Sequence, residues 1–342
     1  MKQINFAIIG FGGIARTHAL AVYDANLRYA LPYQLNLTHV VTRKPMDIPL
    51  AGAKNVTDIE AVLADPTIHF IDICTPNDSH LEIVTKAVSY GKSIYCEKPL
   101  SSNYPDALEM VKLVQEGNIL NAVALMCRFM PAVHLLKKEL EKRTIGEVID
   151  FKIRTYHKSY LSEKKKGTWR TLAQDGKGAL LDLGVHLIDL VQFTLGDIQK
   201  ATHNERIYFK DRSQVDEITD SVLMLEDGTM GHLEVSRVFA EREQTDRFEI
   251  YGTKGSIKIN FLKPYEIEIY RFDQNTTEIK KVDERDEIMQ YYIGERGSLG
   301  FFQNCHTASL IHFANRIVGH SPFNIAATFE DALKCQRIID CE

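Results

Sequence analysis

The fold is decided near the N-terminus, where residues 4–15 read INFAIIGFGGIA. Residues 4–9 are a short run of mostly apolar residues, which is typical of a buried strand. The run ends in a G-x-G-x-x-A turn, and a helical pattern follows to about Tyr29. A glycine turn between a strand and a helix is the context in which this motif binds a dinucleotide. The alternative is an ordinary glycine turn of an α/β protein.

Each position of this turn has a physical role in dinucleotide binding. Gly10 permits the tight turn, Gly12 lets the backbone approach a pyrophosphate, and Ala15 keeps the helix close to the strand. The helix N-terminus, with Gly13 and Ile14, offers free N–H groups and a positive dipole end to the phosphates. We therefore predict that these five residues bind a cofactor.

The second predicted strand, residues 37–41, ends in Thr42, Arg43 and Lys44. An acid at this place would bind the ribose hydroxyls of NAD and repel a 2′-phosphate, whereas Arg and Lys pair with a phosphate. We therefore predict that these three residues contact the cofactor and that NADP is preferred, with NAD as the alternative.

Two further predicted strands also end in polar residues. Residues 70–74 precede Thr75, Pro76, Asn77 and His80, and residues 94–96 precede Glu97, Lys98 and Pro99. The carboxyl ends of parallel strands face the ligand crevice of an open α/β sheet. Pro99 restricts the backbone of Lys98, which favours a lysine held in place for chemistry. A surface ion pair is the alternative. We expect residues 75–77, His80, Glu97 and Lys98 on the cofactor side.

The pattern of elements changes near Arg128. Strands and helices alternate before it, which predicts a doubly wound parallel sheet in residues 1–126. Residues 127–342 contain successive strands without helices between them, which predicts an α+β domain with an open, mostly antiparallel sheet. The C-terminal helices are expected to pack back toward the first domain. The uncovered sheet face predicts a homodimer or homotetramer.

A second chemical stretch, residues 178–189, reads GALLDLGVHLID. Asp182 and His186 are four residues apart and share one face of a helix. Histidine is the side chain best suited to proton transfer near neutrality, and Asp182 is placed to orient it. A buried, hydrogen-bonded histidine is the alternative, and zinc spacing is lacking, so no metal is predicted. In the polar loop 157–177, Trp169 and Arg170 form either a substrate wall or a packing anchor.

Composition limits the function further. The chain has 342 residues, a net charge of −5 and only one compact basic run, which gives no support for nucleic-acid binding. No apolar stretch reaches the roughly 20 residues of a membrane helix. The six cysteines lie apart without zinc spacing, and no signal-peptide pattern is seen at the N-terminus. We therefore expect a cytoplasmic protein that acts on a small molecule.

Together these motifs resemble the glucose–fructose oxidoreductase / inositol dehydrogenase (Gfo/Idh/MocA) family. The similarity rests on the glycine turn, Thr75-Pro76-Asn77 with His80, Glu97-Lys98-Pro99, Arg128 with Pro131, Trp169-Arg170, and the Asp182-x-Gly184-x-His186 motif. The resemblance implies a Rossmann domain for residues 1–126 and a substrate-binding and oligomerisation domain for residues 127–342. It also implies a cis peptide bond before Pro99 and a cofactor contact for Arg128.

The resemblance further implies an NAD(P)-dependent oxidoreductase that moves a hydride between nicotinamide and a secondary alcohol or carbonyl of a sugar or polyol. Lys98 would reach both the nicotinamide ribose and the substrate, His186 would be the acid/base, and Asp182 its partner or a substrate contact. Whether Lys98 or His186 moves the proton stays open. Two rivals are a non-catalytic NAD(P)-binding regulator and a nicotinamide-assisted glycosidase or lyase.

Overall fold

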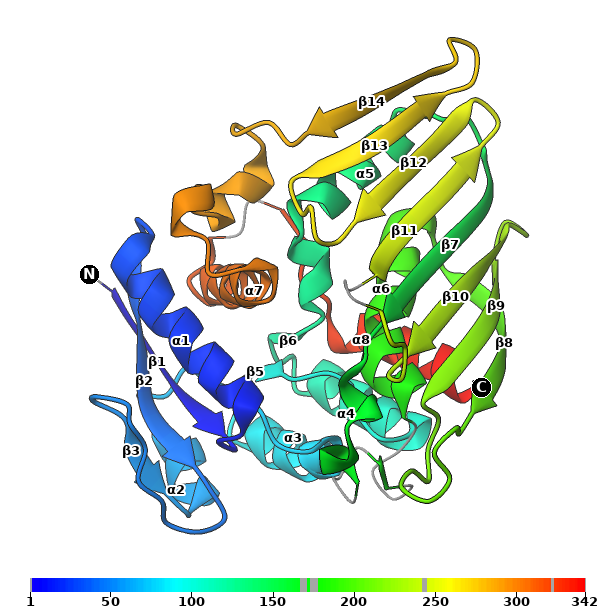
Figure 1. The fold of residues 1–342 in the computed structure, drawn as a ribbon. Helices are drawn as coiled ribbons and strands as arrows, with labels where there is room; N and C mark the ends of the chain where they lie inside the picture. Colours follow the sequence, from blue (N-terminus) through cyan, green and yellow to red (C-terminus); the bar gives the residue numbers. More distant parts are fainter. Residues whose placement is uncertain (1, 167–170, 173–177, 242–244, 321–322, 342) are drawn as a thin grey trace. The chain divides into compact units, whose positions relative to one another are not determined.

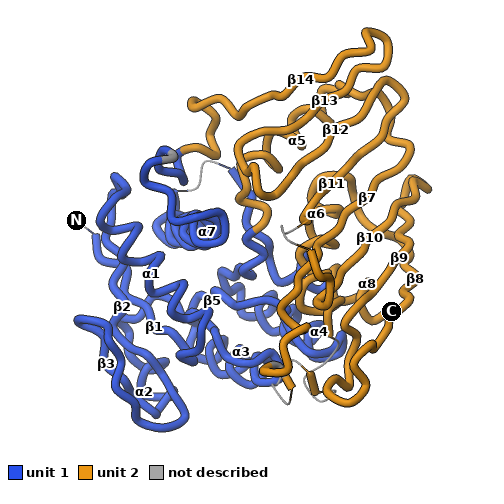
Figure 2. Tube along the Cα trace, in the orientation of Figure 1, with its two compact units in different colours: residues 1–126, 290–333 blue, residues 127–289, 334–342 orange. Residues whose placement is uncertain are grey.

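The computed structural model describes residues 2–166, 171–172, 178–241, 245–320 and 323–341. Backbone contacts divide the chain into two compact units, which Figure 2 shows in different colours. The first unit contains residues 1–126 and 290–333, and the second contains residues 127–289 and 334–342. The chain therefore returns to the first unit after completing most of the second.

The first unit is built on a six-stranded sheet in the order β3-β2-β1-β4-β5-β6, with all neighbouring strands parallel. The strands are β1 (Lys2–Ile9), β2 (Tyr33–Val41), β3 (Lys54–Val56), β4 (Phe70–Ile73), β5 (Ser93–Cys96) and β6 (Asn121–Val123). The order reverses between β1 and β4, which is where a doubly wound sheet opens its ligand crevice. The predicted parallel sheet is confirmed.

Five α-helices of the described residues belong wholly to this unit. They are α1 (Gly13–Arg28), α2 (Ile59–Ala64), α3 (His80–Ser89), α4 (Tyr104–Glu116) and α7 (Phe301–Ile317). Figure 1 shows that α7, far along the chain, packs beside α1. Local sequence explains two helix starts: Asp58 accepts N–H bonds from the first turn of α2, and Asn103 accepts the N–H of Asp106 in α4.

The second unit contains an eight-stranded sheet in the order β14-β13-β12-β11-β7-β10-β9-β8. The strands are β7 (Val148–Tyr156), β8 (Ile198–Arg206), β9 (Ile218–Leu225), β10 (Met230–Ser236), β11 (Thr245–Gly252), β12 (Gly255–Asn260), β13 (Glu266–Arg271) and β14 (Thr276–Lys281). All neighbours are antiparallel except β7 and β10, which are parallel. The expected mostly antiparallel sheet is therefore confirmed.

Helices cover one face of this second sheet. Helix α5 (Pro131–Glu141) contacts β12 and β13, and also α6 (Val185–Leu195), which continues from a turn that contacts β10. Side chains alternate along the strands, so Leu223 and Leu233 are buried whereas Val222 and Met230 are 37% and 52% exposed. The last helix, α8 (Phe329–Asp340), starts in the first unit and ends in the second.

Three details of the elements differ from the sequence prediction. Strand β2 begins at Tyr33 rather than residue 37, and β3 and β14 were not predicted. Both missed strands lie at sheet edges and contain no buried residue, so they lack the apolar run that marks a buried strand. None of the described helices is both long and apolar enough to span a membrane.

Candidate active site

The glycine turn joins β1 to α1 in the way the motif predicts. Gly10 has a φ of +90°, and its N–H donates to the Val41 carbonyl at 2.9 Å. A Cβ on Gly10 would lie 3.0 Å from the Cys74 carbonyl oxygen and from Thr75. The turn therefore crosses the carboxyl ends of its two neighbouring strands closely enough to require glycine.

The start of α1 is open and carries no acid. Gly12 is the N-cap residue without a side-chain cap, and a Cβ at Gly12 or Gly13 would meet nothing within 4 Å. Ala15 is fully buried, which lets the helix lie close to the sheet. Free N–H groups at the start of a 16-residue helix, with open space before them, fit the pyrophosphate of a dinucleotide.

The loop after β2 presents its two cations to solvent. Asn55 of β3 holds the loop, because its amide donates to Thr42 Oγ1 at 2.8 Å and to the Val40 carbonyl at 3.0 Å. Thr42 in turn donates to the Lys44 carbonyl at 2.7 Å. Arg43 and Lys44 are exposed. They are therefore charged groups on a braced turn, available to an anion.

The loop after β4 is held to the Glu97-Lys98-Pro99 motif by His80. The ring of His80 is 1% exposed, and its nitrogens lie 3.0 Å from the Leu100 and Thr75 carbonyl oxygens. Burial lowers the pKa of His80, although the two carbonyl contacts oppose that shift. The described contacts of His80 thus connect two main-chain segments that flank the candidate site. Asn77 donates to Ser102 at 2.8 Å in the same region.

The Glu97-Lys98-Pro99 motif directly follows β5. The peptide bond before Pro99 is cis, as predicted. Glu97 is 5% exposed, and its Oε2 accepts the main-chain N–H of Lys98 at 3.0 Å. Because β1 and β5 belong to one parallel sheet, Lys98 and the glycine turn lie at the same end of its strands.

Sequence reasoning missed a buried charge network behind this motif. His18 of α1 lies 2.9 Å from Asp72 Oδ2 through Nδ1, and 3.2 Å from Glu97 Oε1 through Nε2. The same Nε2 lies 3.2 Å from His306 Nδ1 of α7. All four residues are at most 5% exposed. A histidine and an aspartate inside apolar elements were the only signal in the sequence.

The network holds charge on His18. Burial disfavours the imidazolium, but Asp72 and Cys74 outweigh it and raise the pKa of His18 well above its usual 6.5. Burial also raises the pKa of Glu97, yet His18, His306 and Lys98 outweigh that effect and the net shift is downward. His18 is therefore a cation shared between two buried carboxylates.

Two overlapping groups in this network have residue types that bind metals: His18, Asp72 and Cys74, and His18, Glu97 and His306. The other members instead lie 2.9 to 3.4 Å from the two nitrogens of His18, so both nitrogens are engaged. A raised pKa at His18 also favours a proton over a metal ion at that ring.

In the second unit, the Asp182/His186 segment starts as a π-helix, Leu180–Gly184, and becomes α6 at Val185. The sequence predicted one regular helix. The π-turn changes the angular spacing of Asp182 and His186, and such turns are frequent at functional sites. Asp182 forms an ion pair with Arg237 Nη2 at 2.7 Å, and this partner was not predicted.

Asp216 fixes the start of that segment. Its carboxylate accepts the N–H groups of Gly178 at 2.6 Å and Leu180 at 2.8 Å, and the hydroxyl of Thr219 at 2.8 Å. A Cβ on Gly178 would lie 2.0 Å from the Asp216 carbonyl oxygen, so only glycine fits there. The main chain before Asp182 is therefore tightly held.

Arg128 is buried in an ion pair with Asp189. Nε lies 2.9 Å from Asp189 Oδ2, Nη2 lies 2.6 Å from Oδ1, and the guanidinium packs 4.8 Å from the centre of the Phe193 ring. Trp169 and Arg170, the predicted substrate residues, lie outside the described residues.

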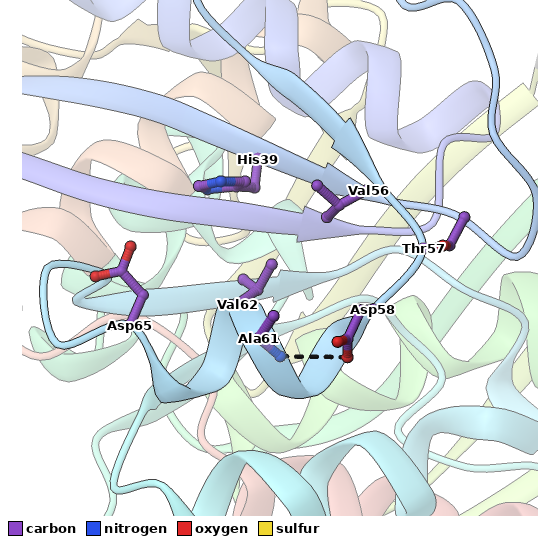
Figure 3. Close-up of a pocket in the computed structure, with 7 residues that line it drawn as sticks. All are labelled: His39, Val56, Thr57, Asp58, Ala61, Val62 and Asp65. Atoms are coloured by element: carbon purple, nitrogen blue, oxygen red, sulfur yellow. Dashed lines mark hydrogen bonds between the residues drawn. The ribbon is translucent and has the colours of Figure 1, made fainter.

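A hollow of about 370 Å³ lies beside α2, away from these motifs (Figure 3). Its polar lining includes His39, Asp58 and Asp65. Asp58 is used to cap α2, and Asp65 accepts bonds from Thr67. Carboxylates at this hollow disfavour a pyrophosphate, so we do not assign the dinucleotide to it.

The parallel sheet, the glycine turn and the open helix start are those of a dinucleotide-binding protein of the Rossmann type. Comparison with known proteins agrees: residues 4–124 match the oxidoreductase family with an NAD-binding Rossmann fold, and residues 133–258 match the GFO/IDH/MocA C-terminal domain. The chain belongs to the Gfo/Idh/MocA family of NAD(P)-dependent oxidoreductases.

Relatives with known names are similar over most of the chain. Levoglucosan dehydrogenase from Pseudarthrobacter phenanthrenivorans is 27% identical over 299 residues, which are 79% of this chain and 76% of the relative. A levoglucosan dehydrogenase structure with NADH and levoglucosan has a TM-score of 0.88 at 25% identity, covering 99% of this chain and 96% of that one. The 2,7-anhydro-N-acetylneuraminate hydratase of Escherichia coli K12 is 25% identical over 264 residues, 75% of this chain and 68% of the relative.

Gly10 and Gly12 of the turn give a matched pair of variants. Gly10→Ala should lower the free energy of unfolding by about 1–3 kcal/mol, because alanine is strained at this positive φ. Gly12→Ala should change the unfolding free energy by less than about 0.5 kcal/mol. It should nevertheless weaken dinucleotide binding about tenfold or more, because a methyl group would occupy the backbone's approach to the pyrophosphate.

Denaturant unfolding and dinucleotide titration of both variants measure these effects separately. Unchanged dinucleotide affinity in a folded Gly12→Ala protein would contradict the assignment of the pyrophosphate to this turn.

Proposed function

We propose that this chain transfers a hydride between a nicotinamide dinucleotide and a secondary alcohol or carbonyl of a sugar, polyol or related hydroxylated molecule. The observation that carries the proposal is Lys98, whose main-chain N–H is held by buried Glu97 at the same end of the sheet as the glycine turn. The name of the relative levoglucosan dehydrogenase supports a sugar-like substrate.

The bound dinucleotide supplies the hydride acceptor or donor at its nicotinamide ring. We assign its pyrophosphate to the glycine turn, residues 10–15, and its nicotinamide side to Thr75, Pro76, Asn77, Glu97 and Lys98. His80 contributes by tying the Thr75 and Leu100 main chains together. We keep Arg128 on the cofactor side, with its guanidinium oriented by Asp189.

The chain's own groups manage the proton and the charge on the substrate oxygen. In the oxidation direction a general base takes the hydroxyl proton, and a cation stabilises the developing negative charge. We assign the cation to Lys98 and the base to His186, with Asp182 as a partner whose charge Arg237 balances. In the alternative assignment Lys98 relays the proton itself. Trp169 and Arg170 are proposed substrate contacts, and the second unit is proposed to bind the substrate.

One other function has a specific observation in its favour. The relative from Escherichia coli is named as a hydratase, so a nicotinamide-assisted addition or elimination without net redox change is the second candidate. A regulator that binds the dinucleotide without turnover is the third. Incubation with a sugar panel separates them, because only a dehydrogenase changes the absorbance of reduced nicotinamide in proportion to substrate consumed.

Replacement of the two reactive residues tests their roles. Lys98→Met and His186→Ala should each lower turnover by about 10²–10⁴-fold, the range typical of a lost acid/base group. Dinucleotide affinity should change little, because the glycine turn is intact. Steady-state kinetics and dinucleotide titration check this, and near-normal turnover in both variants would refute the assignment.

The exposed cations after β2 predict a preference for NADP(H). Arg43→Glu should weaken NADP(H) binding about 10- to 100-fold, because a charge-assisted contact to the 2′-phosphate is replaced by repulsion. NAD(H) binding should be equal or tighter. Lys54→Glu makes the same charge change at an exposed residue of β3 and is the control. A wild-type protein that prefers NAD(H) would contradict the prediction.

The uncovered face of the second sheet supports self-association. Val222 and Met230 are exposed there, opposite the face that α5 covers. We expect a homodimer or homotetramer through this sheet, so Met230→Lys should shift the sedimentation coefficient toward that of a monomer. The control is Met46→Lys, an exposed methionine of the first unit. A wild-type protein that sediments as a monomer at all concentrations would refute the expectation.

A further inference from the structure

Within the buried network of His18, Asp72 and Glu97, the first two residues have no task in the reaction as assigned so far. The network connects three places that border the candidate site. His18 belongs to the helix that begins at the glycine turn, Asp72 lies in β4, and Glu97 directly precedes Lys98. Three ionisable groups this deeply buried are costly unless they are paired, so their retention in one cluster calls for a physical account.

The contacts form a chain that leads from Asp72 through His18 and Glu97 to the main chain of Lys98. Asp72 holds the Nδ1 side of His18 through both carboxylate oxygens, at 2.9 and 3.1 Å. The other side of the ring meets Glu97 Oε1 at 3.2 Å, an ion-pair contact outside hydrogen-bond geometry. The second oxygen of Glu97 accepts the Lys98 N–H. Each carboxylate oxygen of Glu97 therefore has a separate task.

The groups around His18 leave it little freedom. The ring packs 5.1 Å from the centre of the His306 ring and 5.6 Å from that of Tyr95. Cys74 Sγ lies 3.4 Å from Nδ1. Contacts from α7, β4 and β5 thus fix the imidazolium, and the imidazolium in turn fixes the carboxylate of Glu97.

We propose that His18 is a positioning residue for the reaction: it acts as a buried cation between Asp72 and Glu97, and through Glu97 it fixes the main chain of Lys98. The proposal rests on the role assigned to Lys98 above. His18 touches neither substrate nor dinucleotide in this scheme. Its effect is to keep the lysine where a small displacement would cost catalysis.

The test uses the full chain with His18→Gln, Glu97→Gln and the double variant. Each single variant should lower kcat by about 10- to 100-fold, since a displacement of about 1 Å can have that effect. Dinucleotide affinity of the His18→Gln protein should stay within about threefold of wild type, because His18 contacts neither the dinucleotide nor the glycine turn's phosphate site in this scheme. The double variant should be no more than about threefold slower than the slower single variant, because both changes break one chain of contacts.

A matched control separates positioning from general damage. Tyr33→Phe removes a buried hydrogen bond of 2.7 Å to Asn315 in the same unit, at the first residue of β2. It should lower the melting temperature and leave kcat unchanged. Asp72→Asn preserves shape while removing the charge that holds His18, and it should reproduce the loss of kcat in a protein that folds even if His18→Gln does not.

Three results would overturn the proposal. One is kcat values of the Asp72→Asn and Glu97→Gln proteins equal to wild type. Another is a loss of kcat in the double variant that equals the product of the two single losses. The last is a stoichiometric metal ion whose removal causes the same loss, because the histidines would then be ligands. Lys98→Met tests the proposed function separately from the role of His18. If that variant turns over normally, the proposed function is wrong, whatever the His18 variants show.

Discussion

The pairing of a histidine cation with two buried carboxylates is the interaction on which the first unit's site depends. Burying an isolated charge is strongly unfavourable, and even a paired charge gains stability only when geometry and further hydrogen bonds compensate for lost water. Asp72, His18 and Glu97 satisfy that condition in part through the main-chain N–H of Lys98. Removing His18 would leave two buried carboxylates without their cation, so the three constrain one another and the backbone that follows β5.

The same strand ends are constrained a second time by backbone sterics. Gly10 passes so close to the Cys74 carbonyl that a side chain would collide, and His80 spans the Thr75 and Leu100 carbonyls. The loops after β1, β4 and β5 are therefore connected by the close approach of the glycine turn, by the His80 ring and by the ion pairs of the buried network. These contacts restrict the main chain at the carboxyl ends of three strands that are neighbours in the sheet.

The sequence predicted the fold well because its signals are local. Apolar runs, glycine turns and their alternation identify strands and helices within a few residues, and they located both β1 and the Lys98 motif. The partners of the functional residues were harder to predict. His18 and Asp72 are 54 residues apart, and Asp182 and Arg237 are 55 apart. Such pairs depend on sheet register and helix docking, which no single window of sequence contains.

The π-turn at residues 180–184 was missed for a different reason. Its residues carry the same apolar pattern that an α-helix would carry, so composition does not distinguish the two. What creates the turn is a set of contacts from outside it: Asp216 binds the N–H groups of Gly178 and Leu180, and Gly178 allows the close approach.

The two units thus hold their main chain in the same way at the places where reactive side chains are expected. A buried carboxylate accepts main-chain N–H groups at or shortly before the residue in question. Glu97 accepts the N–H of Lys98, and Asp216 accepts those of Gly178 and Leu180, four and two residues before Asp182. Holding the backbone fixes where each side chain begins, and at Asp182 the ion pair with Arg237 holds the side chain as well. A fold built in this way can change its substrate by altering surface side chains while the carboxylates that position the backbone stay unchanged.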